Sequence, residues 1–466
     1  MSDDTDTPPS RDVTLTAYQQ EFVEVVVNSK PPSRFLLVSP PGVGSKAALA
    51  AVARALKAKR GTLRCLSIAP APLAFMWQEQ LFRFGGLEVV AMTPQTYRQL
   101  QAESGAGMNV WSQVSSAVAS IDFLKSAGRM DGVLAARWDL VLLDEAHRCT
   151  DTSQRGEVAR AIWNASNVGI AVATTQTPND LPWLAANTGT TMIRWKLAAL
   201  MGEKALPQRR FHVINYMPSE SERRIAGWIQ ERLGQVPKAH HAQFTAQLLL
   251  RRLESSAYAF EQTLRRLLAK ETFGDTDLDD WVADELEEDA GSTATARSLR
   301  IDRQAGEELL GLLEGEPTDS KWESCFRLLS SCGMGKTGWG VLFTEYADTA
   351  EYLEYLAKSR GLNAFLFTGG GAPAARYHAL QESRHNPALL ITTSAVEGID
   401  FPFVNQAVHY DLPWTARRLL QRIGRVERVT SPFAAFDHYC ILGQNAVSGV
   451  LTGLLEKMQV IENEWK

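Results

Sequence analysis

The sequence predicts an α/β protein with two parallel-sheet lobes in tandem, joined by a helical segment. Short apolar runs alternate with helical patterns in two separate series, which indicates parallel strands with crossover helices. Every polar motif of the first series follows the carboxyl end of a predicted strand, where open parallel sheets bind their ligands. The chain has 466 residues, which is long for one hydrophobic core, so two large domains are expected.

The composition indicates the cellular compartment of the protein more clearly than its binding partner. The formal net charge is −5, so a nucleic-acid partner would need a local basic channel. No uncharged apolar run reaches about 18 residues, which argues against a membrane span and a membrane partner. Residues 1–12 are acidic and Pro-rich and are expected to form a disordered leader rather than a signal peptide. The five cysteines form no Cys-x-x-Cys pair, which is typical of reduced thiols in a cytoplasmic protein without a zinc site.

The first series of strands and helices occupies residues 13–200. Residues 15–20 begin a helix, with Thr16 as a suitable N-cap. Residues 34–38 form an apolar strand, followed by the loop Ser39-Pro-Pro-Gly-Val-Gly-Ser-Lys46 and an Ala-rich helix that ends near residue 59. In such a strand–loop–helix unit, backbone N–H groups at the helix start can bind phosphate. Further elements are predicted as strands at residues 63–68, 88–92, 117–121, 140–143 and 169–173, and as a helix at 73–84.

Two carboxylates follow the most apolar of these strands. Residues 140–143 are all apolar and predict a strand buried on both faces, and Asp144-Glu-Ala-His147 comes directly after it. Acidic side chains at such a position are costly unless they hold a cation or do chemistry. A nucleotide triphosphatase needs one carboxylate for Mg²⁺ and one to position the attacking water. The alternative is that Asp144 only caps a helix.

The pattern changes near residue 200. Residues 201–317 are expected to form a helical linker segment, with a strand-like passage at 211–216 and Leu- and Arg-rich helices over 219–270. Within it, residues 275–289 contain nine carboxylates and no basic residue, which indicates a solvated, mobile run. The second lobe is placed at residues 318–466. It begins with a helix at 319–330, and its strands are expected near 341–344, 364–367, 388–392, 405–410 and 437–442.

Residues 421–428 read Gln-Arg-Ile-Gly-Arg-Val-Glu-Arg and are predicted to lie on a helix of the second lobe. This spacing places Arg425 and Arg428 one turn apart on one helix face. Two guanidinium groups at that spacing suit the recognition of phosphate oxygens. The alternative is a helix face that forms salt bridges.

The motifs form an ordered set that resembles a known family. The set comprises Tyr18-Gln19, Ser39-Pro-Pro-Gly-Val-Gly-Ser-Lys46, Ala69-Pro70, Asp144-Glu-Ala-His147, Thr175-Gln-Thr-Pro178, Phe343-Thr344, Glu397-Gly-Ile-Asp400 and residues 421–428. From about residue 13 onward, the chain resembles the two-domain motor of the superfamily-two helicases with a DEAH motif. It is most similar to the bacterial Swi/Snf-like translocase branch, which residues 252–264 and Asp411-Leu-Pro-Trp414 also match. The resemblance implies RecA-like lobes, ATP and Mg²⁺ as cofactors, and double-stranded DNA as the partner.

The resemblance assigns roles in nucleotide binding and catalysis. Gln19 would read the adenine, Asp144 would hold Mg²⁺ through water, and Glu145 would orient the hydrolytic water. Arg425 and Arg428 would reach the γ-phosphate from the second lobe as arginine fingers, an effect worth about three to five decades in rate. The other implied positions are Gln421 in catalysis, and Pro41, Gly42, Val43, Gly44, Ser45, Lys46, Ala47, Gly398 and Asp400 in nucleotide binding.

The resemblance also implies coupling and nucleic-acid contacts. His147 and Gln421 would couple the nucleotide site to the lobe interface, together with Thr175 and Thr177. Nucleic-acid phosphates would meet Pro70, Thr344, Thr392, Thr393 and Trp414, which gives no sequence specificity. Four arginines of the linking helices could supplement them, namely Arg251, Arg252, Arg265 and Arg266. The alternative for these four is a solvated helix face or pairing with the acidic run.

The phosphate loop departs from the family pattern, which is Gly-x-Gly-Lys followed by Thr or Ser. Two registers are open for Gly44-Ser45-Lys46-Ala47. In one, Ser45 occupies the lysine position and Lys46 the hydroxyl position. In the other, the loop is one residue longer, Lys46 reaches the phosphates, and Ala47 replaces the hydroxyl that binds Mg²⁺. Both registers predict weakened or altered use of Mg²⁺–ATP.

A second Gly-rich run matches the phosphate-loop spacing better but lies in the wrong place. It reads Gly333-Met-Gly-Lys336-Thr337, and it follows a predicted helix and precedes a predicted strand. Because a phosphate loop follows a strand and opens a helix, this run is expected to be a simple helix–strand connection.

The function expected on these grounds is an ATP-dependent Swi/Snf-like translocase that acts on duplex DNA, as part of a bacterial assembly such as one for genome defence. One alternative is a nucleotide-binding switch or scaffold that hydrolyses ATP slowly or not at all because of the altered loop. A further alternative is an RNA helicase, which shares the motifs.

Overall fold

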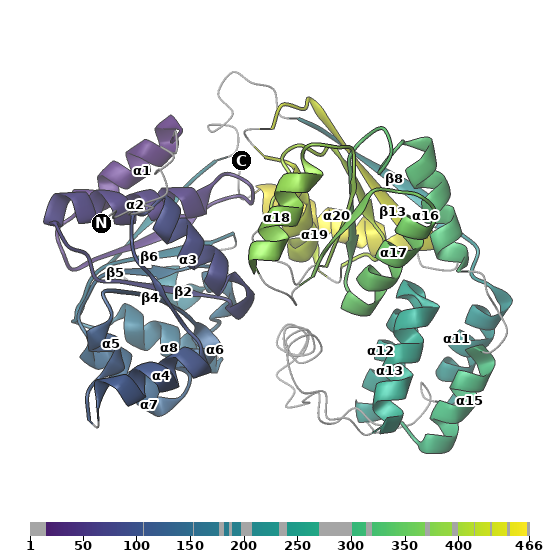
Figure 1. The fold of residues 1–466 in the computed structure, drawn as a ribbon, viewed down its shortest axis with the longest axis horizontal. Helices are drawn as coiled ribbons and strands as arrows, with labels where there is room; N and C mark the ends of the chain where they lie inside the picture. The colour runs from purple at the N-terminus through teal and green to yellow at the C-terminus, as the bar shows by residue number, and fades with distance from the viewer. Residues whose placement is uncertain are drawn as a thin grey trace, which may run out of the picture. The chain divides into compact units, whose positions relative to one another are not determined.

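The structure of the protein is a computed structural model (Figure 1). It describes residues 15–105, 107–151, 153–176, 181–185, 189–196, 207–232, 240–269, 301–313, 319–368, 373–393, 399–413, 415–428, 431–444 and 448–463. The leader at 1–12, the acidic run at 275–289, Thr177, Gly398 and Trp414 lie outside the described residues. The chain divides into two compact units: unit 1 contains Met1–Leu206 and Gln459–Lys466, and unit 2 contains Pro207–Met458.

Unit 1 is built on a seven-stranded sheet with the strand order β3-β4-β2-β5-β6-β1-β7. All of the pairs between these strands are parallel. The strands are β1 (Ser33–Val38), β2 (Cys65–Ala69), β3 (Val90–Met92), β4 (Ser116–Ser120), β5 (Trp138–Leu143), β6 (Val168–Thr175) and β7 (Thr190–Arg194). The apolar run that forms β5 is buried because this strand lies at the centre of the sheet.

Helices cover both faces of this sheet. The right-handed sense of parallel crossovers places α2 and α3 on one face and α8 on the other, as Figure 1 shows. The helices are α1 (Ala17–Val27), α2 (Ser45–Arg60), α3 (Ala74–Arg83), α4 (Pro94–Ser104), α5 (Val110–Gln113), α6 (Ile121–Leu124), α7 (Ala127–Ala135), α8 (Gln154–Trp163) and α9 (Pro182–Ala185). Two 3₁₀ turns, η1 (Ala71–Leu73) and η2 (Ala146–Arg148), follow the ends of β2 and β5.

Unit 2 contains a six-stranded sheet with the order β10-β11-β9-β12-β13-β8, again with parallel pairs. Its strands are β8 (Gln208–Tyr216), β9 (Gly340–Thr344), β10 (Ala364–Phe367), β11 (Leu389–Thr393), β12 (Gln406–His409) and β13 (Ala435–Gly443). Its helices are α11 (Glu220–Arg232), α12 (His240–Ser255), α13 (Ala257–Ala269), α15 (Arg303–Leu313), α16 (Ser320–Ser331), α17 (Ala347–Ser359), α18 (Pro373–Ser383) and α19 (Ala416–Val426). The last helix, α20 (Ser448–Asn463), begins in unit 2, and its residues from Gln459 onward are assigned to unit 1.

The helical segment packs on the second sheet's helices and belongs to the same compact unit. Apolar side chains of α11, α12, α13 and α15 form one core together with Tyr346, at the start of α17. Two ion pairs strengthen this contact: Arg266 donates to both carboxylate oxygens of Asp348, at 2.7 and 2.8 Å, and Arg252 lies 3.5 Å from the same carboxylate. Arg252 is buried and Arg266 is half-buried, and both pair with Asp348, whereas Arg265 is exposed and pairs with Glu261 on its own helix. The alternative of pairing with the acidic run lies outside the described residues.

The structure confirms the predicted fold class of two parallel-sheet α/β lobes joined by a helical segment. One strand was missed: β7 is a half-buried edge strand, and its mixed polar sequence gives no alternating pattern of the kind that marks a strand. The strand-like passage at 211–216 also proved longer than expected. As β8 it pairs with β13 along nine residues and forms one edge of the second sheet.

Candidate functional site

The phosphate loop of unit 1 connects β1 to the first turn of α2. Gly42 and Gly44 have φ angles of 83° and 81°, a left-handed conformation that glycine adopts at little cost. Gly44 is the N-cap, and the 16-residue helix begins at Ser45. The first N–H groups of a helix have no partner within the helix and carry partial positive charge. The loop therefore has the geometry of an anion site.

Asp144 lies at the carboxyl end of β5 and is 4% exposed. Its Oδ1 accepts a hydrogen bond from the Thr174 hydroxyl at 2.7 Å, and its Oδ2 accepts one from the Trp77 indole N–H at 2.8 Å. Asp144 caps no helix, so the capping alternative is wrong. The sequence had not pointed to Trp77 or Thr174, although a buried indole N–H usually finds a polar partner.

Lys46 brings a positive charge to this carboxylate. Its Nζ lies 3.5 Å from Oδ2 of Asp144, which joins the phosphate loop to the end of β5. The carboxylate suits Mg²⁺, a hard cation that prefers oxygen ligands, and the loop with its lysine suits a phosphate. Ser45 is the first residue of α2 and Ala47 the third, so no hydroxyl follows the lysine.

Glu145 has a strained backbone. Its φ of 51° makes it the one non-glycine residue with positive φ among the residues that the structure describes. The left-handed conformation costs such a residue about 1–2 kcal/mol, and strain of this kind concentrates at functional sites. The Glu145 Oε2 lies 3.5 Å from Nδ1 of the buried His147. Two predicted site residues are thus neighbours at the end of β5.

Gln19 and Tyr18 contact the phosphate loop directly. The Gln19 amide donates to the backbone oxygens of Val43 and Gly44, both at 3.2 Å, and the Tyr18 hydroxyl donates to the Val43 oxygen at 2.9 Å. The structure therefore brings Gln19 together with the loop, while its predicted contact with adenine stays a prediction. Pro41 is part of the same loop and is half-buried, and Thr175 lies at the end of β6, where its backbone oxygen accepts from Ser39 N at 3.0 Å.

In unit 2, the predicted arginine fingers lie at the end of α19. The helix ends at Val426, so Arg428 lies beyond it, and the expectation of two arginines on one helix face is wrong. Glu427 is the C-cap of the helix, and its carboxylate pairs with Arg209 at 2.7 Å and with His438 at 2.9 Å. Burial alone would raise the pKa of Glu427, but these two partners lower it to about 2.

Arg428 forms an ion pair with Asp400, which brings two predicted site residues together. Burial lowers the pKa of Arg428 to about 10, so its guanidinium is still charged near neutral pH. Arg425 is 8% exposed, and its backbone oxygen accepts from Phe401 N at 2.8 Å. Gln421 is half-buried on the same helix. The segment with Asp400 is thus held against the end of α19.

The candidate nucleic-acid positions are largely buried. Thr344, Thr392 and Thr393 are at most 2% exposed, and the Thr344 hydroxyl donates to Asp411. Pro70 is buried at the end of β2, and its backbone oxygen accepts from Leu73 N at 2.9 Å. Their contact with nucleic acid stays a prediction.

The second Gly-rich run is a helix–strand connection, as the sequence predicted. It lies between α16, which ends at Ser331, and β9, which begins at Gly340. Gly333 and Gly335 have φ angles of 68° and 79° and form tight turns. Since no helix starts after the lysine of this run, it lacks the geometry of the phosphate loop.

Comparisons with known proteins find relatives of this chain. Residues 320–430 match the family described as the helicase conserved C-terminal domain. Over 123 residues, the chain is 32% identical to the uncharacterized ATP-dependent helicase YqhH of Bacillus subtilis, which covers 26% of this chain and 22% of that protein. Over 415 residues, it is 25% identical to the RNA polymerase-associated protein RapA of Vibrio cholerae, which covers 78% of this chain and 41% of that protein.

A third relative acts on RNA by its name. The chain is 24% identical over 163 residues to the DEAD-box ATP-dependent RNA helicase 5 of Arabidopsis thaliana, which covers 34% of this chain and 30% of that protein. The chain therefore spans less than half the length of each of these three relatives. The chain is therefore similar to helicases, and the region that matches the helicase conserved C-terminal domain lies in unit 2. In the part of the chain that the structure describes, no helix is long and apolar enough to span a bilayer.

Proposed function

We propose that the protein is a Swi/Snf-like motor that hydrolyses ATP and translocates on double-stranded DNA. The observation that carries this proposal is the meeting of two motifs in unit 1. Lys46, at the start of α2, reaches within 3.5 Å of the buried Asp144 at the end of β5. A phosphate-binding loop, a cation and a carboxylate are the parts that nucleotide triphosphatases combine.

The proposed roles follow from the chemistry of the side chains. Lys46 and the N–H groups of α2 bind the phosphates, Asp144 holds Mg²⁺ through water, and Glu145 orients the hydrolytic water. Mg²⁺, when bound, neutralises charge on the β- and γ-phosphate oxygens. Arg425 and Arg428 act as arginine fingers, and Arg428 must then exchange Asp400 for a phosphate oxygen.

The choice of duplex DNA rests on the resemblance of the motifs to the Swi/Snf-like branch. RapA, which aligns with 78% of this chain, is RNA polymerase-associated by its name, and this supports a motor that works in a bacterial protein assembly. We place that assembly in the cytoplasm and keep genome defence as one setting for it. The match to an RNA helicase keeps an RNA substrate as an outcome of the test.

A second candidate function is a nucleotide-binding switch. It is favoured by the loss of the hydroxyl that binds Mg²⁺ in the family, whose position holds Lys46 in one register and Ala47 in the other. It is also favoured by the Lys46–Asp144 ion pair, which a metal would have to rearrange. Such a switch would bind ATP and hydrolyse it slowly or not at all.

The test is steady-state ATP hydrolysis with Mg²⁺, measured alone and with duplex DNA, single-stranded DNA or RNA. Glu145→Gln serves as the inactive variant, and Glu103→Gln, at an exposed position of α4, serves as its matched control. Hydrolysis that duplex DNA stimulates and that only Glu145→Gln abolishes supports the motor. ATP binding without hydrolysis above the inactive variant, with every polymer, would replace the motor by the switch.

A further inference from the structure

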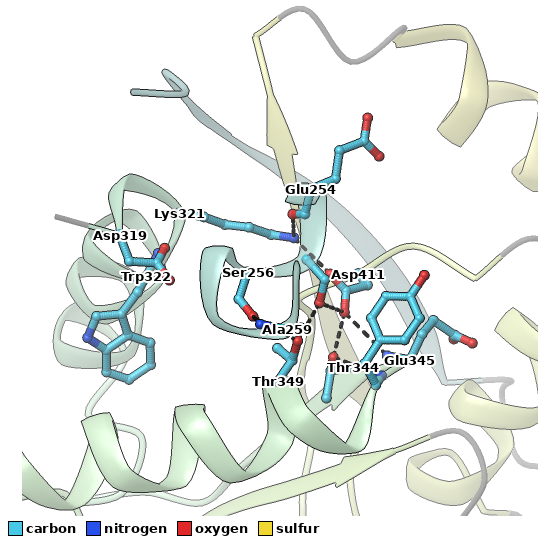
Figure 2. Close-up of polar contacts among 12 residues, drawn as sticks. Glu254, Ser256, Ala259, Asp319, Lys321, Trp322, Thr344, Glu345, Thr349 and Asp411 are labelled. Carbon is cyan, nitrogen blue, oxygen red and sulfur yellow. Dashed lines mark hydrogen bonds and ion pairs between the residues drawn. The ribbon is translucent and has the colours of Figure 1, made fainter. Parts of the chain in front are cut away.

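A buried polar cluster joins α12, in the helical segment of unit 2, to the carboxyl ends of the strands β9 and β12. We call it the Asp411 junction, and each of its members is at least nine-tenths buried. Figure 2 shows the side chains of Lys321, from α16, and Thr344, from β9, directed toward the Asp411 carboxylate. The junction consists of Ser255, Lys321, Thr344, Glu345, Thr349 and Asp411.

The Asp411 carboxylate receives hydrogen bonds from three separate parts of the chain. Its Oδ1 accepts from Lys321 Nζ at 2.8 Å, and its Oδ2 accepts from the Ser255 hydroxyl at 2.9 Å and from the Thr344 hydroxyl. Burial raises the pKa of Asp411, but the charge of Lys321 and the three hydrogen bonds outweigh it and hold this pKa below its ordinary value. The carboxylate is therefore ionised near neutral pH.

Asp411 also contacts α19, the helix that carries Arg425. Arg422 of α19 donates to the backbone oxygen of Asp411 at 2.6 Å and forms an ion pair with Glu345. Arg418, one turn earlier, donates to the other carboxylate oxygen of Glu345 at 3.2 Å. Arg425 follows Arg422 by one turn on this helix. A continuous set of buried contacts thus leads from Ser255 to the position of Arg425.

A buried ion pair is seldom kept for stability alone, because apolar residues of similar size often serve as well. What such a cluster adds is a defined geometry, since its donors and acceptors are satisfied in one arrangement only. In the Asp411 junction, Ser255 lies 156 positions from Asp411 in the sequence. The hydroxyl therefore meets the carboxylate only when the helical segment is docked in this one position.

We propose that Ser255 is a positioning residue that couples the docking of the helical segment, through Asp411 and Arg422, to the position of Arg425. The proposal rests on the function proposed above, in which Arg425 acts in ATP hydrolysis. It implies that a bound polymer or partner that shifts the turn between α12 and α13 changes turnover without touching the phosphate loop.

The first test measures amide hydrogen exchange in the full chain. Ser255→Ala removes the hydrogen bond to Asp411, and Ser383→Ala is the matched control, because Ser383 is equally buried but its hydroxyl donates to the Leu380 oxygen of its own helix, at 2.9 Å. Amides of α19 should exchange about tenfold faster in Ser255→Ala than in the control, the loss expected for a hydrogen bond to a charged acceptor. Equal exchange of α19 in the two variants would overturn the proposal.

The second test separates positioning from a general loss of structure. In Ser255→Ala, kcat for ATP should fall while KM for ATP is unchanged, since the phosphate loop lies in unit 1, and thermal melts should show both variants folded. A wild-type chain without hydrolysis would contradict the proposed function, while the exchange comparison would still decide the coupling.

Coupling is reciprocal, so the junction can also be tested from its other end. Arg422→Lys should speed exchange of the amides in the turn at residues 255–256, and this measurement decides the question if Ser255→Ala does not fold. Unchanged exchange at that turn would count against the coupling.

Discussion

Replacing Lys321 by Met tests whether the Asp411 junction is a buried, unscreened ion pair. Lys321 is 5% exposed, and its ammonium donates to the Glu254 backbone oxygen at 2.7 Å and to Asp411 at 2.8 Å. Removing one partner of a buried pair costs about 3–5 kcal/mol. Because Asp411 keeps the hydroxyl donors of Ser255 and Thr344, the loss should lie near the lower end, at about 3 kcal/mol of the free energy of unfolding.

The sign of the pH dependence follows from the pKa of Asp411. In the wild type this pKa lies below its ordinary value, so the stabilisation is present above the pKa of the unfolded carboxyl and is lost as pH falls through the folded pKa. In Lys321→Met, burial is no longer offset by the ammonium, and the pKa of Asp411 should rise. The destabilisation should therefore be greatest near pH 7 and should shrink toward pH 4, where the carboxyl becomes protonated in the variant.

The assay is unfolding in urea, monitored through the hydrogen exchange of the backbone amides of β9 and β12. These amides report on unit 2 separately from unit 1. Lys358→Met is the matched control, because Lys358 forms an ion pair of similar length, 2.7 Å, at a position 56% exposed. An exposed pair of this kind is worth about 0.3–0.5 kcal/mol. A loss in Lys321→Met that matches this control, or that does not change between pH 7 and pH 4, would refute the reasoning.

Four further outcomes are expected. Lys46→Ala should weaken binding of a fluorescent ATP analogue at least about tenfold while Lys336→Ala leaves it unchanged, and the reverse result would mean that the wrong loop has been assigned. Replacing Ser45 by Lys and Lys46 by Thr together should raise steady-state turnover, whereas unchanged turnover would show the native loop to be competent. The folded pKa of Glu427 is lowered from 4.5 to about 2, so in the wild type about 3 kcal/mol of the free energy of unfolding should be lost as pH falls from 4.5 to 2. In Glu427→Gln this pH-dependent loss should be absent. Urea unfolding that shows the same loss in the variant would contradict this. Asp319→Asn should raise Tm at pH 7.5 but not at pH 4. Burial raises the folded pKa of Asp319 to about 6, so this carboxyl destabilises the fold as pH rises from the unfolded pKa to the folded pKa. Equal Tm values of the wild type and the variant at pH 7.5 would contradict this.

The strands and the phosphate loop could be predicted because their signals are local. Each signal lies within a few positions of the element that it marks: the apolar run forms β5 itself, the two glycines come just before α2, and the carboxylates come directly after residue 143. Sequence pattern and structure therefore agree. The helical start at Ser45 also follows from the glycine before it, since Gly44 has the left-handed conformation of a turn.

The partners of the site residues could not be predicted because they come from distant parts of the chain. The hydrogen bond from Trp77 to Asp144 spans 67 positions, and the ion pair of Arg266 with Asp348 spans 82. No periodicity marks such contacts. The early end of α19 was also hidden from the sequence, because no glycine or proline occurs in the five residues after Val426. The ion pair of Glu427, the C-cap, with Arg209 of the edge strand β8 again joins distant parts of the chain.

The altered sequence of the phosphate loop should affect the role of the lysine less than the role of the hydroxyl. A one-residue shift at a helix start turns a side chain by about 100° and advances it by about 1.5 Å. Lysine has a long, flexible stem that can absorb such a shift, and Lys46 does reach Asp144 from its position on α2, at 3.5 Å. A serine has no such reach, so the hydroxyl of Ser45 cannot replace one at residue 46 or 47, the positions that the two registers give it. The loss should therefore fall on the affinity for Mg²⁺ rather than on the binding of the nucleotide.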